Sequence, residues 1–361
     1  MAKLWMMKNK KIVMIGPSIN SKGGIASVVL NYMDAGLFDK FSIDYLATHV
    51  EGGKFTKLWV ALSTGLNFVY LLLTGQVAFL HAHVARWNSF WRKSVFMLLC
   101  HLFSRPYIIH IHSGGFIAFY ENDCNDFQRK LINFFLKHAA KVIVLTNETS
   151  RWALSVSHHN KVEVLANFIQ QDVNSNKVKA REKGRVLFLG RFTEEKGIYD
   201  LLEVLPDLLV KIPEIKLILC GEGDSDSVNE KIASLEMKDH VELLGWVTGD
   251  DKLKELYSAQ VFVLPSFVEG VPMGVLEAMQ SGCPVVATTV GGIPDQIENG
   301  VQGILYEAGD QRALRVAMEA VLTDVVLAER MGQQGMLTIK RKFSAAAVMP
   351  KLESIYKTLS M

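Results

Sequence analysis

Two cations stand in a glycine-bounded loop that follows an apolar, strand-like run. Arg191 and Lys196 lie within Gly190–Gly197, directly after Arg185–Leu189 and before a helical pattern. Such a loop places both side chains at the carboxyl end of a strand and beside a helix N-terminus, where positive charge and backbone N–H groups attract anions. The pattern favours binding of a diphosphate. The alternative is a pair of solvated surface charges.

A second glycine-rich segment carries two glutamates on either side of a predicted helix start. Pro272 suits the first helical position, and the helix is expected to run from Val275 to Gln280. Glu269 would accept hydrogen bonds from sugar hydroxyls, and Glu277 would bind a ribose diol through both oxygens. The predicted ligand-binding set is Glu269, Gly270, Val271, Pro272, Met273, Gly274 and Glu277. For Glu277 the alternative is an exposed helix charge, although its apolar neighbours would make an idle carboxylate costly.

Further glycine turns follow other predicted strands. Gly23 and Gly24 would let backbone N–H groups approach a ligand at a helix start, or would merely permit a tight turn. Gly221-Glu222 and Val247 follow two strands in the second half, where a flat base could lie against backbone. The first turn lacks G-x-G-x-x-G, so a dinucleotide-binding fingerprint is not supported.

Two His-x-His pairs occur at predicted strand ends, His81/His83 and His110/His112. Strand alternation puts both members of a pair on one face, so a metal site has to be weighed. Zinc or iron would want further ligands and a supporting carboxylate, and neither motif contains Asp or Glu. We therefore expect no metal, with one histidine of each pair packed and the other facing the cleft. His112 is the predicted reacting centre.

Short apolar runs alternate with amphipathic stretches along the chain. This alternation predicts parallel sheets covered on both faces by helices, hence an α/β fold. The rhythm stops at a polar joint near residues 170–183 and then restarts. We predict two Rossmann-like domains, 1–170 and 171–342, with residues 343–361 packing back on the first. Because open α/β sheets bind ligands beyond the carboxyl ends of their strands, the site is expected in a cleft between the two domains.

Composition excludes several classes of protein. The chain has 361 residues, 49% of them hydrophobic, and a net charge of +2, which argues against disorder and against a nucleic-acid binder. The charge is divided unevenly, with 18 basic and 9 acidic residues in 1–170. The four cysteines form no C-x-x-C pair and read as reduced, cytosolic thiols. The N-terminus shows no signal-peptide pattern.

A basic and aromatic segment raises the question of a membrane. Arg86, Arg92 and Lys93 precede an apolar helix predicted from Ser94 to Phe103, which suits a surface facing anionic lipid. The alternative is a core helix with charged ends. The uncharged run Leu58–Leu80 is long enough to ask about a span, but a Thr74-Gly75-Gln76 break divides it into a helix and a short strand.

Together these motifs resemble the retaining GT-B glycosyltransferases, the large family 4 type that includes bacterial mannosyl- and galactosyltransferases. The match is strongest from Val186 to Leu305, where the G-R-x-x-x-x-K-G loop, the G-E-G turn and E-G-x-P-M-G-x-x-E-A-M follow in order. The first half matches more loosely, through Gly23-Gly24 and H-I-H-S-G-G at 110–115. F-W-R-K at 90–93 is similar to enzymes of capsule and exopolysaccharide assembly. The short polar joint is a departure, and it leaves the crossover between the domains unplaced.

The resemblance implies retaining transfer of a hexose from a nucleoside-diphosphate sugar to a glycan or polyprenyl-diphosphate-linked acceptor. Arg191 and Lys196 would hold the diphosphate, Glu277 the ribose, Glu269 the sugar, and His112 would contact the sugar from the other domain. Neither metal nor cofactor is expected, and the location would be cytoplasmic, with peripheral contact to the inner membrane. The alternatives are a nucleotide-sugar epimerase or hydrolase on the same scaffold, or a non-catalytic sugar-binding protein.

Overall fold

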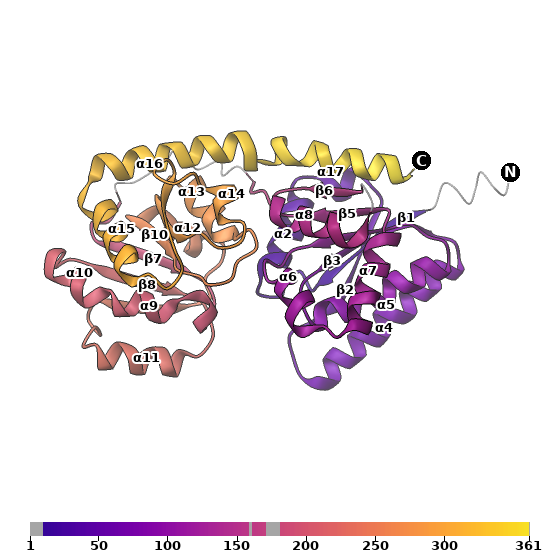
Figure 1. The fold of residues 1–361 in the computed structure, drawn as a ribbon, viewed down its shortest axis with the longest axis horizontal. Helices are drawn as coiled ribbons and strands as arrows, with labels where there is room; N and C mark the ends of the chain where they lie inside the picture. The colour runs from indigo at the N-terminus through magenta and orange to yellow at the C-terminus, as the bar shows by residue number, and fades with distance from the viewer. Residues whose placement is uncertain (1–9, 159–160, 171–180, 361) are drawn as a thin grey trace. The chain divides into compact units, whose positions relative to one another are not determined.

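The chain folds as two compact units, each built on its own parallel sheet (Figure 1). The first unit comprises Met1–Gln170 and Ala345–Met361, and the second comprises Gln171–Ser344. The computed structural model describes residues 10–158, 161–170 and 181–360. Most of the predicted polar joint and the first nine residues of the chain lie outside these ranges.

The first sheet contains six parallel strands in the order β2-β1-β3-β4-β5-β6. Its central strands β3 and β4 are rich in apolar residues and buried at all but one position, which is the pattern of a sheet covered on both faces. The strands are β1 (Lys11–Pro17), β2 (Ile43–His49), β3 (Val77–Val84), β4 (Tyr107–Ile111), β5 (Lys141–Val144) and β6 (Val162–Val164).

The second sheet has the order β12-β11-β10-β7-β8-β9, also all parallel. Its strands are β7 (Arg185–Leu189), β8 (Lys216–Cys220), β9 (Val241–Gly245), β10 (Val261–Leu264), β11 (Val285–Thr288) and β12 (Gly303–Tyr306). Chain order runs outward in one direction from β7 to β9 and in the other from β10 to β12. The loops after β7 and β10 therefore diverge at the switch point between them, where doubly wound sheets bind ligands.

Helices connect the strands in both units. In the first unit they are α2 (Gly24–Asp34), α3 (Leu37–Lys40), α4 (Lys54–Leu73), α5 (Asn88–Leu102), α6 (Phe116–Ala118), α7 (Asp126–His138), α8 (Asn147–Ser157) and α17 (Ala345–Ser360). In the second they are α9 (Ile198–Glu203), α10 (Leu205–Lys211), α11 (Ser225–Ser234), α12 (Gly249–Ser258), α13 (Met273–Gln280), α14 (Ile293–Gln296), α15 (Gln311–Thr323) and α16 (Val325–Thr338).

Three segments test the sequence interpretation locally. The run 58–80 does divide at Thr74-Gly75-Gln76, with α4 before the break and β3 after it. The prediction that a helix begins at Ser94 is wrong, because α5 begins six residues earlier, at Asn88. The carboxyl-terminal helix α17 packs on β3 of the first unit, where Tyr356 is fully buried (Figure 1).

Gly221 allows the ends of β7 and β8 to meet, and this gives a first prediction. A Cβ at this position would overlap the carbonyl oxygen of Gly190, so Gly221→Ala must push the two strand ends apart. We expect it to lower the free energy of unfolding by about 2 kcal/mol or more in urea denaturation. Gly65→Ala is the control, because a Cβ there meets no atom within 4 Å and alanine favours the helix. Equal stability of Gly221→Ala and the wild type would contradict the close approach.

Candidate active site

An ion pair joins the two loops at the switch point of the second sheet. The Lys196 ammonium, in the turn after β7, donates to Glu269 Oε1, in the loop after β10, over 2.5 Å. Ser266 Oγ donates to the same oxygen over 2.8 Å. Glu269 is buried, with 8% of its surface exposed, so losing either donor would leave a poorly compensated charge. The predicted diphosphate-binding and sugar-binding residues are thus in direct contact.

The loop that carries Glu269 is held in place by contacts with the turn after β11. Gly292 N donates to Gly270 O over 2.7 Å, and Gly291 packs so closely on the Glu269 carbonyl that a side chain there would overlap it. The helix that follows, α13, begins at Met273. Pro272 is extended and precedes the first turn, which corrects its prediction as the first helical residue. Val271 and Met273 are buried, and Gly274 lies over the Phe262 ring.

Glu277 lies one turn into α13 and has a partner that the sequence did not indicate. Lys252, on α12, donates to Glu277 Oε1 over 2.8 Å. The Glu277 side chain is mostly buried, at 14% exposed, so it is not an idle surface charge. Lys252 lies in a highly charged stretch, D-D-K-L-K, so the sequence does not distinguish it from the solvated charged residues around it.

The loops after β7, β8 and β9 meet along one edge of the second sheet. Phe192 N donates to Glu222 O over 2.9 Å, and Gly221 N donates to Gly245 O over 2.7 Å. Arg191 is exposed beside Phe192, and Val247 is half-buried two residues beyond the end of β9. Phe192, which the sequence interpretation overlooked, is the residue that joins the G-R-x-x-x-x-K-G loop to the G-E-G turn.

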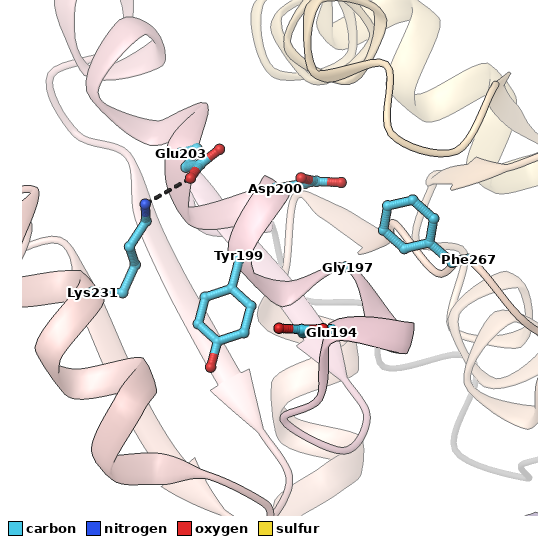
Figure 2. A pocket seen from close by; sticks show the side chains of 7 residues that line it. All are labelled: Glu194, Gly197, Tyr199, Asp200, Glu203, Lys231 and Phe267. Atoms are coloured by element: carbon cyan, nitrogen blue, oxygen red, sulfur yellow. Dashed lines mark hydrogen bonds and ion pairs between the residues drawn. The ribbon is translucent and has the colours of Figure 1, made fainter.

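A pocket of about 310 Å³ lies on another side of the Lys196 loop (Figure 2). Its lining consists of Glu194, Gly197, Tyr199, Asp200, Glu203, Lys231 and Phe267. Three carboxylates face this space, and its lysine is already paired with Glu203 over 2.6 Å. The negative lining does not suit a diphosphate. It includes neither Arg191 nor Lys196, so this pocket is separate from the predicted donor site.

In the first unit, Gly23 and Gly24 stand at the start of α2. Gly23 is its N-cap and Gly24 its first residue, and a Cβ built on either meets no atom within 4 Å. This end of the helix is therefore open, as an approach by a ligand requires.

Four histidines stack on one face of β3 and β4. His83 Nδ1 lies 2.7 Å from His112 Nε2, and His81 Nε2 lies 3.2 Å from His110 Nδ1. The second nitrogen of His81 contacts the Tyr356 hydroxyl of α17 over 2.5 Å. His81 and His83 are both fully buried, so the expectation that one member of that pair faces an open cleft is wrong. His112 is half-buried at the strand end and held by His83.

Burial keeps these rings neutral. Desolvation, with smaller electrostatic effects of His81 and Lys93, lowers the pKa of His112 to about 3, and desolvation lowers the pKa of His81 to about 3. The pKa values of His83 and His110 also fall well below 6.5 for the same first reason. Ring nitrogens of His81, His83 and His110 lie within 4.8 Å of one another, which is close enough to hold a metal ion. However, both nitrogens of His81 already have partners.

Of the three predicted lipid-facing cations, Lys93 is corrected by the structure. Lys93 is buried at 1% exposure and donates to Ser89 Oγ over 2.7 Å, so it cannot face a lipid surface. Desolvation, and then the Arg92 charge, lowers the pKa of Lys93 to about 7. Arg92 is half-buried, and Arg86 lies over the Trp87 ring at 4.1 Å.

The second half of the chain resembles a known protein family. Residues 170–337 match the model of a family described as glycosyl transferases group 1. A capsular polysaccharide biosynthesis glycosyltransferase of Staphylococcus aureus is 30% identical over 173 residues, which cover 47% of this chain and 45% of that protein. The alignment thus spans less than half of either protein.

Two solved structures share the fold over nearly the whole chain. A sucrose-phosphate synthase from Thermosynechococcus elongatus superposes with a TM-score of 0.80 at 19% identity, covering 97% of this chain and 99% of that one. The Anabaena protein HepE in complex with UDP gives a TM-score of 0.74 at 16% identity, covering 96% and 100%. The predicted α/β fold with two Rossmann-like domains is confirmed.

The buried histidines predict how stability depends on pH. Below pH 6.5 the histidines of the unfolded chain become protonated, whereas His81 and His112 of the folded chain, with pKa values near 3, stay neutral. The free energy of unfolding should therefore fall as pH drops from 6.5 toward 4, by about 1.4 kcal/mol per pH unit for each such histidine. Urea denaturation followed by tryptophan fluorescence reports mainly on the first unit, which holds five of the six tryptophans.

His110→Leu should reduce this pH slope by about one proton, whatever its effect on absolute stability. His138→Gln, at an exposed position, is the control and should keep the wild-type slope. An unchanged slope in His110→Leu would show that folding does not lower the pKa of His110, and would contradict this account.

Proposed function

We propose that this chain, whose residues 170–337 match the model of the glycosyl transferases group 1 family, moves a hexose from a nucleoside-diphosphate sugar to a glycan or polyprenyl-diphosphate-linked acceptor. The observation that carries the proposal is the contact between Lys196 and Glu269 at the switch point of the second sheet. A sugar diphosphate needs a cation for its phosphates and a hydrogen-bond acceptor for its sugar hydroxyls, and this contact places both groups side by side.

The diphosphate of the sugar nucleotide is bound by cations and backbone N–H groups. Lys196 has three N–H donors and gives one to Glu269, so two remain for phosphate oxygens. Arg191 adds a second cation, and the first turn of α13 adds backbone N–H groups. These donors stabilise the charge that grows on the diphosphate as the glycosidic bond breaks. They do there what a divalent metal does elsewhere, so transfer proceeds without one.

The remaining residues orient the sugar nucleotide. Glu269 accepts hydrogen bonds from the sugar, while Glu277, held by Lys252, accepts from the ribose. Gly221, Glu222 and Val247 lie where a base packs along the sheet edge. His112, kept neutral by burial, donates or accepts one hydrogen bond to the sugar. We infer retention, with the acceptor attacking the face that the diphosphate leaves and the departing phosphate taking its proton.

The comparisons support a proposed biological setting. The Staphylococcus aureus relative acts in capsular polysaccharide biosynthesis, and the Anabaena structure contains UDP, which supports a nucleotide sugar and a role in capsule, exopolysaccharide or lipopolysaccharide assembly. The four cysteines are free and buried, as suits a reducing, cytoplasmic compartment. A lipid-linked acceptor would bring the protein to the inner membrane as a peripheral enzyme.

Removal of the Lys196 charge tests the proposal directly. Lys196→Gln should lower kcat/KM for transfer from a labelled nucleotide sugar by about 100- to 1000-fold, the loss expected for one charged donor at a leaving group. UDP-, GDP- and ADP-sugars are supplied with bacterial membranes as the acceptor source. Lys211→Gln is the matched control, since Lys211 also forms an ion pair, with Glu319, but on the surface.

Full transfer by Lys196→Gln would refute the assigned role of this lysine. Donor turnover at the same rate with and without membranes would favour the hydrolase or epimerase alternative. Donor binding without turnover on any acceptor would favour the non-catalytic alternative.

The metal-free mechanism predicts that a chelator leaves the rate unchanged. Transfer measured in excess EDTA should stay within about twofold of the untreated rate, because cations of the protein hold the diphosphate. A rate that collapses in EDTA and returns with magnesium or manganese would contradict this.

A further inference from the structure

The outer face of α4 is an apolar stripe that no other described element of the chain covers. Large side chains recur on it every three or four residues, which places them on one face of the helix. Phe55 is 89% exposed, Trp59 74% and Leu66 72%. The α4 stripe consists of Phe55, Trp59, Leu62, Leu66, Tyr70 and Leu73. Exposed apolar patches of this kind mark an interaction surface.

The opposite side of α4 anchors the helix to the first unit. Phe68, Leu71 and Leu72 are buried, and Thr64 Oγ1 donates to Ala47 O of β2 over 2.8 Å. Phe68 also packs on Phe96 of α5, with ring centroids 5.2 Å apart. By length and composition α4 is able to cross a bilayer. Because its inner side belongs to the core, the helix instead presents its outer side to a partner while staying on the sheet.

The charges around the α4 stripe indicate which kind of partner it would bind. Neither α4 nor α5 contains an aspartate or glutamate, and Lys54 and Lys57 are exposed at the start of α4. Helix α5 is a neighbour of α4 (Figure 1). It exposes Val95 and Leu102 in addition. The nearest carboxylate in the sequence is Glu51, in the loop before α4, and it already accepts from Lys22 N over 3.0 Å. A second copy of α4 and α5 themselves would offer these lysines no carboxylate, whereas phosphate headgroups would pair with them. Aromatic and aliphatic side chains beside lysines are typical of helices that lie in the plane of a membrane interface.

We propose that the α4 stripe docks this chain onto an anionic lipid bilayer, with α4 lying in the headgroup region parallel to the membrane. The helix is about 30 Å long, so it would follow the surface over that distance. The docking surface is α4 rather than the Arg86, Arg92 and Lys93 cluster, of which Lys93 is buried. Its purpose, delivery of a lipid-linked acceptor, rests on the proposed function, but binding itself is measured without any turnover.

Co-sedimentation with vesicles tests the docking surface. The wild type should bind vesicles of phosphatidylethanolamine and phosphatidylglycerol and bind pure phosphatidylcholine less. Trp59→Ser/Leu66→Ser should bind at least about tenfold more weakly, because two large apolar side chains no longer enter the lipid. The control is Val210→Ser/Val326→Ser, which alters two comparably exposed side chains of the second unit, 83% and 76%. It should bind as the wild type does.

Tryptophan quenching locates the contact. Lipids brominated on their acyl chains should quench part of the wild-type fluorescence, and Trp59→Phe should keep vesicle binding but lose most of that quenching. Equal binding by Trp59→Ser/Leu66→Ser and the wild type would overturn the proposal. So would a wild-type dimer in analytical ultracentrifugation that this variant converts to monomer, since a second copy would then be the occupant. Vesicle binding without sugar transfer would overturn the proposed function alone.

Discussion

The second unit depends on holding a nearly buried carboxylate next to an ammonium where two strand loops diverge. Neither Lys196 nor Glu269 is stable there alone, because a charge taken out of water needs a partner. The parallel order of β7 and β10 brings the two loops together, and Gly197 packs on the Pro265 carbonyl, where a side chain would hold the loops apart. Gly221 and Gly291 allow similarly close contacts to the neighbouring loops, at Gly190 and Glu269. The ion pair therefore depends on both the strand order of the sheet and the positions of the glycines.

The two units use burial in opposite ways. The second unit gathers charges at loop ends and pairs them, so that each cation keeps donors for an anion. The first unit stacks imidazoles on one face of β3 and β4 and holds them neutral by desolvation, with Tyr356 of α17 in contact with His81 at one end of the stack. A neutral His112 at the open end of that stack offers a hydrogen bond rather than a positive charge. On its outer side, the same unit exposes the α4 stripe.

Much of this architecture could be predicted from the sequence, because apolar runs that alternate with helical patterns have few folded arrangements. Gly190–Gly197 and the segment from Glu269 to Glu277 were placed at strand ends for the same reason. Partners contributed by distant charged helices could not be predicted, since Lys252 looks like any solvated lysine until α12 is placed against α13. The burial of Lys93 was missed because the helix containing it begins earlier than its apolar run suggests.

The central claim is that side chains and backbone of the second unit, without a metal, recognise the diphosphate of a nucleotide. Calorimetric titration of the metal-free chain with UDP, GDP and ADP, and with the matching monophosphates, measures this directly. One of the three diphosphates should bind about 10- to 100-fold more tightly than its monophosphate, the gain expected from a charge-assisted contact to Lys196. Equal affinity for diphosphate and monophosphate in every pair would contradict the account.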